Sequence, residues 1–231
     1  VEINEEDMFV TVESGVTWAE MAAALAEKNL RTPFWGPFSG LKATVGGSSS
    51  QNSLSMGTSA YGGSPESILC YDIVLPSGDI LKTGSSSMEN SSAFFRHYGP
   101  DLTGLFSGDS GALGVKARIT LRLIKLPTHT LTSSFGFKDY ASMSEGMAAA
   151  AREQSASSNW GLDPKLQQGQ LGRTTLSDAI KAAFAVLKTA RNPFEAIIQL
   201  GKMALAGKRF LTGFDYSAHF VVEGYSIAEV K

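Results

Sequence analysis

The sequence has only one cysteine, Cys70, among its 231 residues. A single cysteine cannot form an internal disulfide bond, so we expect a protein of a reducing compartment, the cytoplasm, rather than a secreted one. Excess charge of one sign is missing as well: the formal net charge is -2, with no basic run and no acidic tail. The composition therefore gives no electrostatic reason to expect nucleic acid or an anionic membrane as the main partner.

Long apolar runs are also absent. The two most apolar helix-like stretches, residues 176–190 and 193–207, are interrupted by charged side chains. These are Lys181, Lys188, Glu195 and Lys202. A membrane-spanning helix needs roughly 18 or more predominantly apolar residues, so we expect no integral membrane segment.

Several common motifs of ligand and metal binding are missing too. There is no G-x-G-x-x-G after a strand, no P-loop, no H-E-x-x-H and no cysteine or histidine pair at metal-binding spacing. The three histidines, His97, His129 and His219, lie far apart in the sequence. Nicotinamide-type Rossmann binding and P-loop chemistry are therefore not predicted, and we expect no metal.

The hydrophobic pattern that is present predicts an α+β fold. It indicates a strand at 8–13, then a helix whose start is marked by a capping box of Thr17 and Glu20. Further on, it indicates a hairpin at 68–84 and a short helical turn at 99–108. The first domain is thus expected to combine a mixed or antiparallel sheet with flanking helices.

Residues 117–123 give the clearest strand pattern. Ala117, Ile119, Leu121 and Leu123 alternate with polar residues, which predicts one buried face and one wet face. Residues 31–63, by contrast, carry no sustained period. A stretch of this length without periodicity in a compact domain is usually functional or wrongly assigned.

The pattern of expected secondary structure changes around Pro127. Beyond it we expect a strand at 131–138, a helix at 139–154, an irregular stretch at 155–172, the two helix-like stretches and a final strand near 218–225. We place the domain boundary between 126 and 131, which gives a first domain at 1–127 and a second, α+β domain at 128–231. The chain opens directly into a strand pattern and stops soon after another, so we expect a piece of a longer protein.

Two segments rich in glycine and small polar residues stand out, "TVGGSSSQNS" at 44–53 and "GDSGALGV" at 108–115. Glycine lets a backbone approach a ligand closely, and successive backbone N–H groups can bind anions. Together the segments would suit a large, flat, polyphosphorylated cofactor. The alternative for the first segment is a flexible linker. The apolar and aromatic residues beside it, among them Leu54, Met56 and Tyr61, weigh against that alternative.

These segments, with "DIVLPSGDILKTG" between them and "YGPDLTGLF" before the second, resemble the FAD-binding domain of the vanillyl-alcohol-oxidase superfamily. The resemblance covers residues 9–127. The superfamily contains flavin-linked D-lactate, glycolate and 2-hydroxyglutarate dehydrogenases and alkyl-dihydroxyacetonephosphate synthase. The resemblance implies FAD as the cofactor, and with it a PCMH-type FAD-binding domain.

The resemblance also implies two sets of cofactor-binding residues. The first set would run past the isoalloxazine ring and ribityl chain: Thr44, Val45, Gly46, Gly47, Ser50, Gln51, Asn52 and Ser53. The second set would pass the adenosine and pyrophosphate: Gly108, Ser110, Gly111, Ala112, Leu113, Gly114 and Val115. Asp101 and Leu102 match a "yDL" element that introduces the second segment.

The chain departs from the family pattern in two respects. The family usually has Glu at the position of Ser110, so the resemblance does not predict the geometry of this loop. The family's first pyrophosphate loop would precede Val1. Residues from 128 onward correspond by position to the family's cap domain, where no catalytic residue can be assigned. The cap side chains able to bind a carboxylate or move a proton are Arg173, Arg191, Arg209, Tyr216 and His219, and surface solvation is the simpler explanation for each.

The leading hypothesis is an FAD-dependent oxidoreductase that oxidises a hydroxyl-bearing carbon of a 2-hydroxy acid by hydride transfer to flavin N5. One alternative is a transferase like alkyl-dihydroxyacetonephosphate synthase, which uses FAD without net redox change. Another is a non-catalytic scaffold whose cofactor-binding site is vestigial. The expected partner is a small-molecule substrate. A homo-oligomer and peripheral membrane association are left open.

Overall fold

The computed structural model describes residues 1–171 and 214–231, which divide into two units. The first unit comprises Val1–Leu131, Gln154–Ser158 and Val221–Lys231, and the second comprises Thr132–Glu153 and Asn159–Phe220. The expected helices at 176–190 and 193–207 lie outside the described residues. The assignment of 1–127 and 128–231 as cofactor and cap domains stays a prediction.

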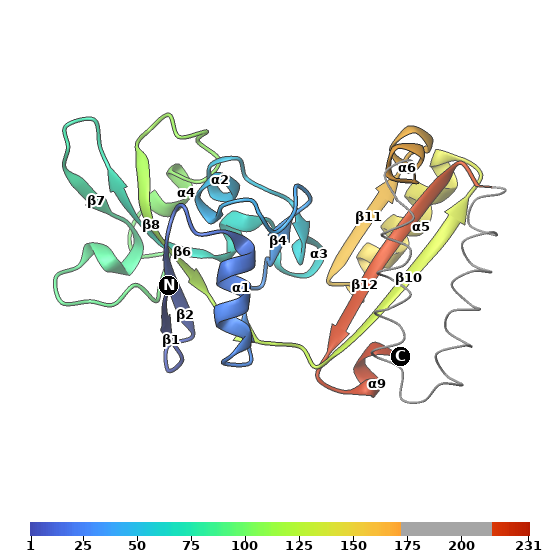
Figure 1. The fold of residues 1–231 in the computed structure, drawn as a ribbon, viewed down its shortest axis with the longest axis horizontal. Helices are drawn as coiled ribbons and strands as arrows, with labels where there is room; N and C mark the ends of the chain where they lie inside the picture. Colours follow the sequence, from blue (N-terminus) through green and yellow to red (C-terminus); the bar gives the residue numbers. More distant parts are fainter. Residues whose placement is uncertain (172–213) are drawn as a thin grey trace. The chain divides into compact units, whose positions relative to one another are not determined.

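The first unit is built on a five-stranded antiparallel sheet (Figure 1). Its strands, in spatial order, are β1 (Glu2–Asn4), β2 (Phe9–Glu13), β8 (Val115–Arg122), β6 (Ile68–Val74) and β7 (Ile80–Lys82). Two small ladders pair β3 (Leu30–Arg31) with β9 (Ile124–Lys125) and β4 (Gly36–Pro37) with β5 (Ser55–Met56). The helical elements are α1 (Trp18–Ala26), α2 (Val45–Ser50), α3 (Thr58–Tyr61), η1 (Ser64–Ser67), η2 (Gly84–Ser87), α4 (Leu102–Leu105) and α9 (Ile227–Val230).

Helix α1 and one face of the sheet form the core. The predicted capping box is present: the Thr17 side chain accepts a hydrogen bond from the Glu20 amide, and the Glu20 side chain accepts one from the Thr17 amide. The buried stripe of α1 lies in one apolar cluster with β2, β6 and β8; the cluster includes Val10, Val12, Trp18, Met21, Leu25, Ile73, Ile119 and Leu121. The predicted hairpin, β6–β7, and the predicted turn, α4, are confirmed.

The strand pattern of β8 is confirmed, but the polar face of the strand is less exposed to solvent than expected. Thr120 is 4% exposed and its hydroxyl shares a hydrogen bond with the hydroxyl of Thr11, at 2.9 Å. The expectation failed at Thr120 because neighbouring side chains cover it, which the period of the strand does not reveal. Lys116 is 5% exposed for another reason: a register shift in the β6–β8 ladder pairs it with the core residue Ile73 and so breaks the alternation at the start of the strand.

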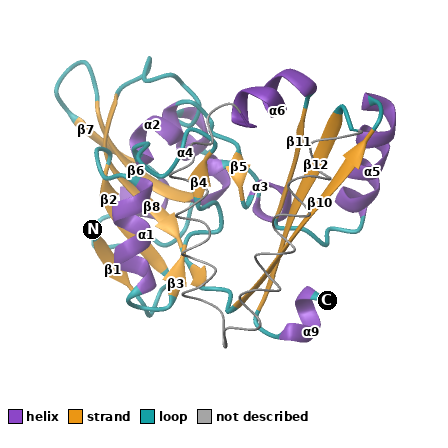
Figure 2. Ribbon diagram, turned by 45° about the vertical axis from the view of Figure 1, so that its right-hand side comes forward, coloured by secondary structure: helices purple, strands orange, loops and turns teal. Residues whose placement is uncertain are grey.

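The second unit contains most of a three-stranded sheet ordered β10 (His129–Phe137), β12 (Tyr216–Gly224), β11 (Ser158–Leu162), together with α5 (Tyr140–Arg152) (Figure 2). Helix α5 packs on β11 without a gap, because a Cβ added at Gly161 would lie 3.0 Å from the sulfur atoms of Met143 and Met147. The expected irregular stretch at 155–172 was wrong, since it contains β11 and α6 (Pro164–Leu171). The α+β class is confirmed. None of the helices in the described part has the length and apolar character to cross a membrane.

A buried ion pair fixes the end of β12 within the first unit. Both guanidinium nitrogens of Arg31 donate to the carboxylate of Glu223, at 2.7 and 2.8 Å, and the two side chains are 9% and 8% exposed. The Arg31 guanidinium also lies over the rings of Trp35 and Tyr61. Two residues 192 positions apart are therefore joined by a bidentate contact that water barely reaches.

We predict that Glu223→Gln lowers the free energy of unfolding by about 3–5 kcal/mol, because it leaves the Arg31 guanidinium buried without a counter-charge. Chemical denaturation measures the loss. The matched control is Glu2→Gln, which removes the exposed partner of Arg118 and should cost less than about 1 kcal/mol. Equal losses in the two variants would contradict a special role for the buried pair.

Candidate cofactor-binding site

The first glycine-rich segment is an ordered helix rather than a linker. The Thr44 side chain caps α2 by accepting a hydrogen bond from the Gly47 amide, at 3.1 Å. The Trp18 indole N–H donates to the Ser48 hydroxyl at 2.7 Å, in a buried contact. The small side chains of α2 are thus packed against the core, which excludes the linker alternative. Sequence reasoning missed this helix because glycine and serine have low helix propensity and tertiary contacts decide the outcome.

Gly46 brings α2 against the turn that follows β2. The Gly46 amide donates to the Ser14 carbonyl at 2.9 Å. A Cβ at position 46 would lie 2.6 Å from the Ser14 Cβ and 2.8 Å from the Ser14 carbonyl oxygen. Only glycine permits this approach without a shift of the backbone.

The second glycine-rich segment is joined directly to the first. The amides of Gly108 and Ser110 donate to the carbonyls of Ser49 and Ser50, each at 2.9 Å. Gly108, Ser110 and Gly111 all have left-handed backbone, with φ of 68°, 54° and 77°. The loop therefore turns sharply where it meets the end of α2, and the two predicted segments lie in direct contact.

A groove with a volume of about 380 Å³ runs between the two segments. Seven predicted residues line it, namely Thr44, Gly46, Gly47, Ser50, Gly111, Gly114 and Val115. Ser14, Gly15 and Lys116 complete the lining. Ligand pockets span roughly 300–1,000 Å³, so this groove can hold a portion of a dinucleotide.

The other predicted residues lie around the groove without lining it. Val45 is 1% exposed and belongs to the core. Asn52 lies beside Gly108, and the Ser53 amide donates to the Ser48 carbonyl. Gln51, Ala112 and Leu113 are exposed, and Gly108 and Ser110 contribute the contacts between the segments. Whether any of these residues touches a cofactor stays a prediction.

Gly15 was missed by the sequence reasoning. It is exposed, lies outside the left-handed backbone region and has no atom within 4 Å of an added Cβ, so the fold itself does not require glycine there. Neither its amide nor the Gly114 amide donates a hydrogen bond within the part of the chain that the structure describes. A small residue with a free N–H beside the groove is what a closely approaching anionic ligand needs. Its signal in the sequence was its place in a turn between a strand and a capped helix.

The loop has a carboxylate, one position before the family's usual Glu. Asp109 accepts hydrogen bonds from the Gly111 amide at 2.9 Å and the Leu113 amide at 3.3 Å. The Lys116 ammonium donates to it at 2.5 Å, and the two side chains are only 2% and 3% exposed. Burial raises the pKa of Asp109, but the hydrogen bonds from Lys116 and the two amides outweigh this, so the pKa lies below its ordinary value.

Tyr71 lies on the other side of Lys116. The ammonium is 5.8 Å from the centroid of the Tyr71 ring, and the Tyr71 hydroxyl shares a hydrogen bond with the Ser107 hydroxyl at 3.0 Å. Burial raises the pKa of Tyr71. The hydroxyl therefore stays protonated and able to donate at neutral pH.

Comparison with known families and structures finds similar proteins. Residues 1–84 match the family model described as "FAD binding domain". The chain is 34% identical over 135 residues to "D-lactate dehydrogenase [cytochrome], mitochondrial" of Arabidopsis thaliana, covering 58% of the chain and 22% of the relative. It is 32% identical over 127 residues to "Glycolate oxidase subunit GlcD" of Bacillus subtilis, covering 55% and 26%.

Solved structures show the same fold. A p-cresol methylhydroxylase with substrate bound superposes with a TM-score of 0.69 at 17% identity, over 100% of this chain and 42% of that one. An alkyldihydroxyacetonephosphate synthase superposes with a TM-score of 0.67 at 16% identity, over 99% and 37%. The chain spans about a quarter of the length of the two curated relatives named above.

The family and its relatives indicate FAD as the cofactor. The groove fits such a group on its own features. Gly15 and Gly111 present open space where a Cβ would project, and the Gly15 and Gly114 amides are available as donors. The Ser50 hydroxyl also lines the groove without a hydrogen bond in the described residues. These donors could hold phosphate oxygens or the polar edge of a ring system.

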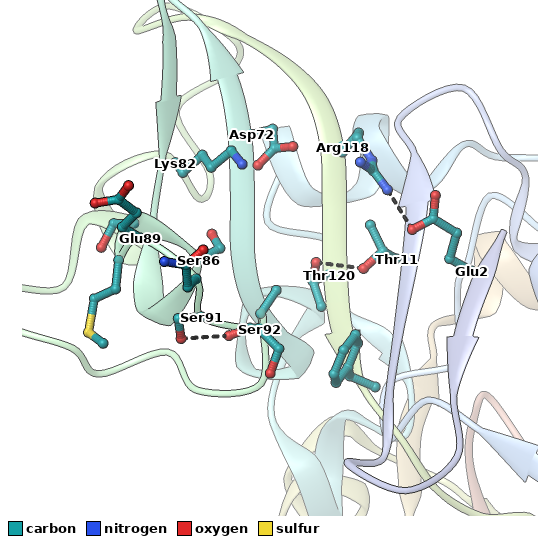
Figure 3. A pocket seen from close by; sticks show the side chains of 15 residues that line it. Glu2, Thr11, Asp72, Lys82, Ser86, Glu89, Ser91, Ser92, Arg118 and Thr120 are labelled. Atoms are coloured by element: carbon teal, nitrogen blue, oxygen red, sulfur yellow. Dashed lines mark hydrogen bonds and ion pairs between the residues drawn. The ribbon is translucent and has the colours of Figure 1, made fainter.

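A second cavity, of about 620 Å³, lies over the outer face of the sheet (Figure 3). Its strand residues alternate in charge: Lys82 is paired in register with Asp72, and Asp72 with Arg118, which forms an ion pair with Glu2. The loop 86–93 supplies most of the rest of the lining. Opposite charges are interspersed in this cavity and no glycine lines it, so it lacks the close backbone approach that the glycines of the groove allow.

The cap candidates are only partly described. Arg173, Arg191 and Arg209 lie outside the described residues. In the second unit, the His219 ring accepts or donates to the hydroxyls of Ser134 and Ser217, at 2.8 and 3.0 Å, and stacks on Trp160. Burial lowers the pKa of His219.

Tyr216, the remaining cap candidate, packs edge-on against Tyr140. In the described ranges, no group of three His, Cys, Asp or Glu side chains could hold a metal ion. No catalytic base is assigned from these contacts.

We predict that Gly15→Leu weakens FAD binding without destabilising the apoprotein, because residue 15 lines the groove and an added Cβ there meets no atom within 4 Å. Fluorescence titration with FAD and thermal unfolding of the apoprotein measure the two effects. Ala22→Leu, at an exposed position of α1, is the control and should alter neither. By contrast, Gly46→Ala should lower stability as well as affinity, since its Cβ would clash with Ser14. Wild-type FAD affinity in Gly15→Leu would contradict the assignment of the groove.

Asp101 provides a pH-dependent test of the element that introduces the loop. Arg96 donates two hydrogen bonds to its carboxylate, and these lower the pKa of Asp101, with the Gly104 amide at the start of α4 acting in the same direction against partial burial. Because the pKa of Asp101 is lower in the folded state than in the unfolded state, where it is near 3.8, the ionised carboxylate stabilises the fold at pH values above 3.8. This stabilisation is lost as the pH falls through the folded-state pKa.

We therefore predict that wild type is more stable than Asp101→Asn at neutral pH and that the difference shrinks toward zero as the pH falls below the unfolded-state pKa, near 3.8, and through the lower folded-state pKa. Denaturation at several pH values measures it. A difference that stays constant across this range would show that charge on Asp101 is not the cause.

Proposed function

We propose that this chain is the cofactor-binding part of an FAD-dependent oxidoreductase that oxidises the hydroxyl-bearing carbon of a small 2-hydroxy acid of the D-lactate or glycolate class. The observation that carries the proposal is the single groove formed by two glycine-rich segments sixty residues apart, with free amides along its wall. The substrate class is supported by the relatives, which include D-lactate dehydrogenases and a glycolate oxidase subunit.

The chain's own contribution is binding and orientation. In this proposal, the amides of Gly15 and Gly114 and the hydroxyls of Thr44 and Ser50 bind the pyrophosphate and the polar edges of the dinucleotide; their place in the lining of the groove supports this role. Glycines at 15 and 111 allow the backbone to approach it closely. When bound, FAD supplies the hydride acceptor for oxidation of a carbon that bears a hydroxyl group.

The transferase alternative receives less support. Its only backing here is the likeness to an alkyldihydroxyacetonephosphate synthase at 16% identity, which concerns the fold alone. The relatives matched at about 30% identity are D-lactate dehydrogenases and a glycolate oxidase subunit. A reducing compartment and a small-molecule substrate remain part of the proposal, which includes neither a particular oligomeric state nor membrane association.

The test is to purify the native-length protein, add FAD, remove unbound FAD by gel filtration, and record the flavin absorbance of the protein before and after anaerobic addition of D-lactate, glycolate or D-2-hydroxyglutarate. We expect a flavin spectrum that is bleached by at least one of these acids, with L-lactate as the stereochemical control. No flavin spectrum, even with added FAD, would overturn the proposed cofactor role. Bound flavin that no hydroxy acid bleaches would overturn the substrate class and favour the transferase.

The scaffold alternative has its own test. Substituting Gly46 or Gly111 with a bulky residue in the native-length protein should abolish both flavin retention and biological activity if the protein is a flavoenzyme. Biological activity that survives the loss of flavin would favour a non-catalytic scaffold.

A further inference from the structure

We propose that Asp109 and Lys116 form a positioning pair that holds the loop 108–114 in the shape needed to receive the cofactor. This inference rests on the proposed FAD-binding role of the groove. It goes beyond that role by assigning a function to two side chains that point away from solvent and whose charges neutralise each other. Neither residue is expected to contact the cofactor through its charged group.

One carboxylate organises the whole loop. Asp109 accepts from the amides of Gly111 and Leu113 and from the Lys116 ammonium, so it is joined to the middle of the loop, to its end and to the strand beyond. Gly111 and Gly114 of this loop line the groove, an added Cβ at Gly111 would meet no atom within 4 Å, and the Gly114 amide donates to no acceptor in the described residues. One part of the groove wall is thus backbone that Asp109 holds in place.

Lys116 anchors this arrangement to the sheet. Its side chain, 3% exposed, extends from β8, and its ammonium lies between the Asp109 carboxylate and the face of Tyr71. The Tyr71 hydroxyl bonds Ser107, the residue just before the loop. The contacts Ser107–Tyr71–Lys116–Asp109 therefore connect the start of the loop to its end through the protein interior.

Stability alone does not explain a buried ion pair at this place. Removing two charges from water costs about as much as their attraction returns, and well-packed apolar residues often do as well or better. What an ion pair with amide hydrogen bonds adds is a fixed geometry. A loop whose amides already point correctly binds its ligand without a further loss of conformational entropy.

The experiment compares wild type with Asp109→Asn, Lys116→Met and the double variant. Each single variant leaves a buried group without its partner, so it should lose both thermal stability and FAD affinity. The double variant replaces the pair with uncharged groups of similar size. We expect it to recover most of the stability while its FAD affinity stays at least about tenfold below wild type, because the loop is no longer preorganised.

Amide hydrogen exchange in the apoprotein is the second measurement. The double variant should exchange the amides of Gly111 and Leu113 faster than wild type, with no change in the turn at 76–79. Glu2→Gln, which breaks an exposed ion pair made by the same strand, is the matched control and should change neither affinity nor exchange in the loop.

The outcomes separate this inference from the proposed function. A double variant that binds FAD as tightly as wild type, with unchanged exchange in the loop, overturns the positioning role while leaving the FAD site intact. If wild type itself does not bind FAD, the proposed function fails, and the positioning inference fails with it. If the single variants do not fold, the FAD affinity and the amide exchange of the double variant still test the positioning role.

Discussion

The groove depends on the contact between two backbone segments that are far apart in the sequence. The amides of Gly108 and Ser110 donate to the carbonyls at the end of α2, and Gly46 brings the start of α2 onto the turn after β2. Because backbone groups make these contacts, the side chains at the groove can stay small. The free amides near the cavity follow from this arrangement, and a bulky residue at Gly46 would separate α2 from its neighbours.

The charged side chains near the groove are paired with each other and do not compete with the backbone amides for a ligand. The nearest ionic groups, Asp109 and Lys116, neutralise each other in the interior, so the groove offers neutral backbone dipoles to an anionic ligand. A cofactor that carries a pyrophosphate and a ring with many donors and acceptors is suited to such a wall. The match of residues 1–84 to the family model described as "FAD binding domain" agrees with this chemistry. The second unit, with its satisfied His219, supplies no assigned catalytic group.

Local patterns predicted much of the fold. The capping box of α1, the hairpin β6–β7, the alternation in β8 and the strands β10 and β12 each depend on interactions within a short stretch, so a window of sequence contains the information. Helix α2 and strand β11 were missed because their sequences are rich in glycine, serine and other weak formers of regular structure. Burial of Ser48 and Ser49, and packing of α5 methionines on Gly161, stabilise these elements instead.

The sequence by itself determined which residue types are available: two clusters of small residues, one lone cysteine, little net charge, and a succession of motifs that resembles an FAD-binding domain. Only the tertiary structure decided that the two clusters wall one groove, that Gly15 joins them, and that Asp109 provides the loop with a carboxylate beside Ser110. These facts depend on hydrogen bonds and ion pairs between residues brought together by folding. The spacing of residues along a chain does not specify such contacts, because they arise from the packing of α1 and the loops on the five-stranded sheet.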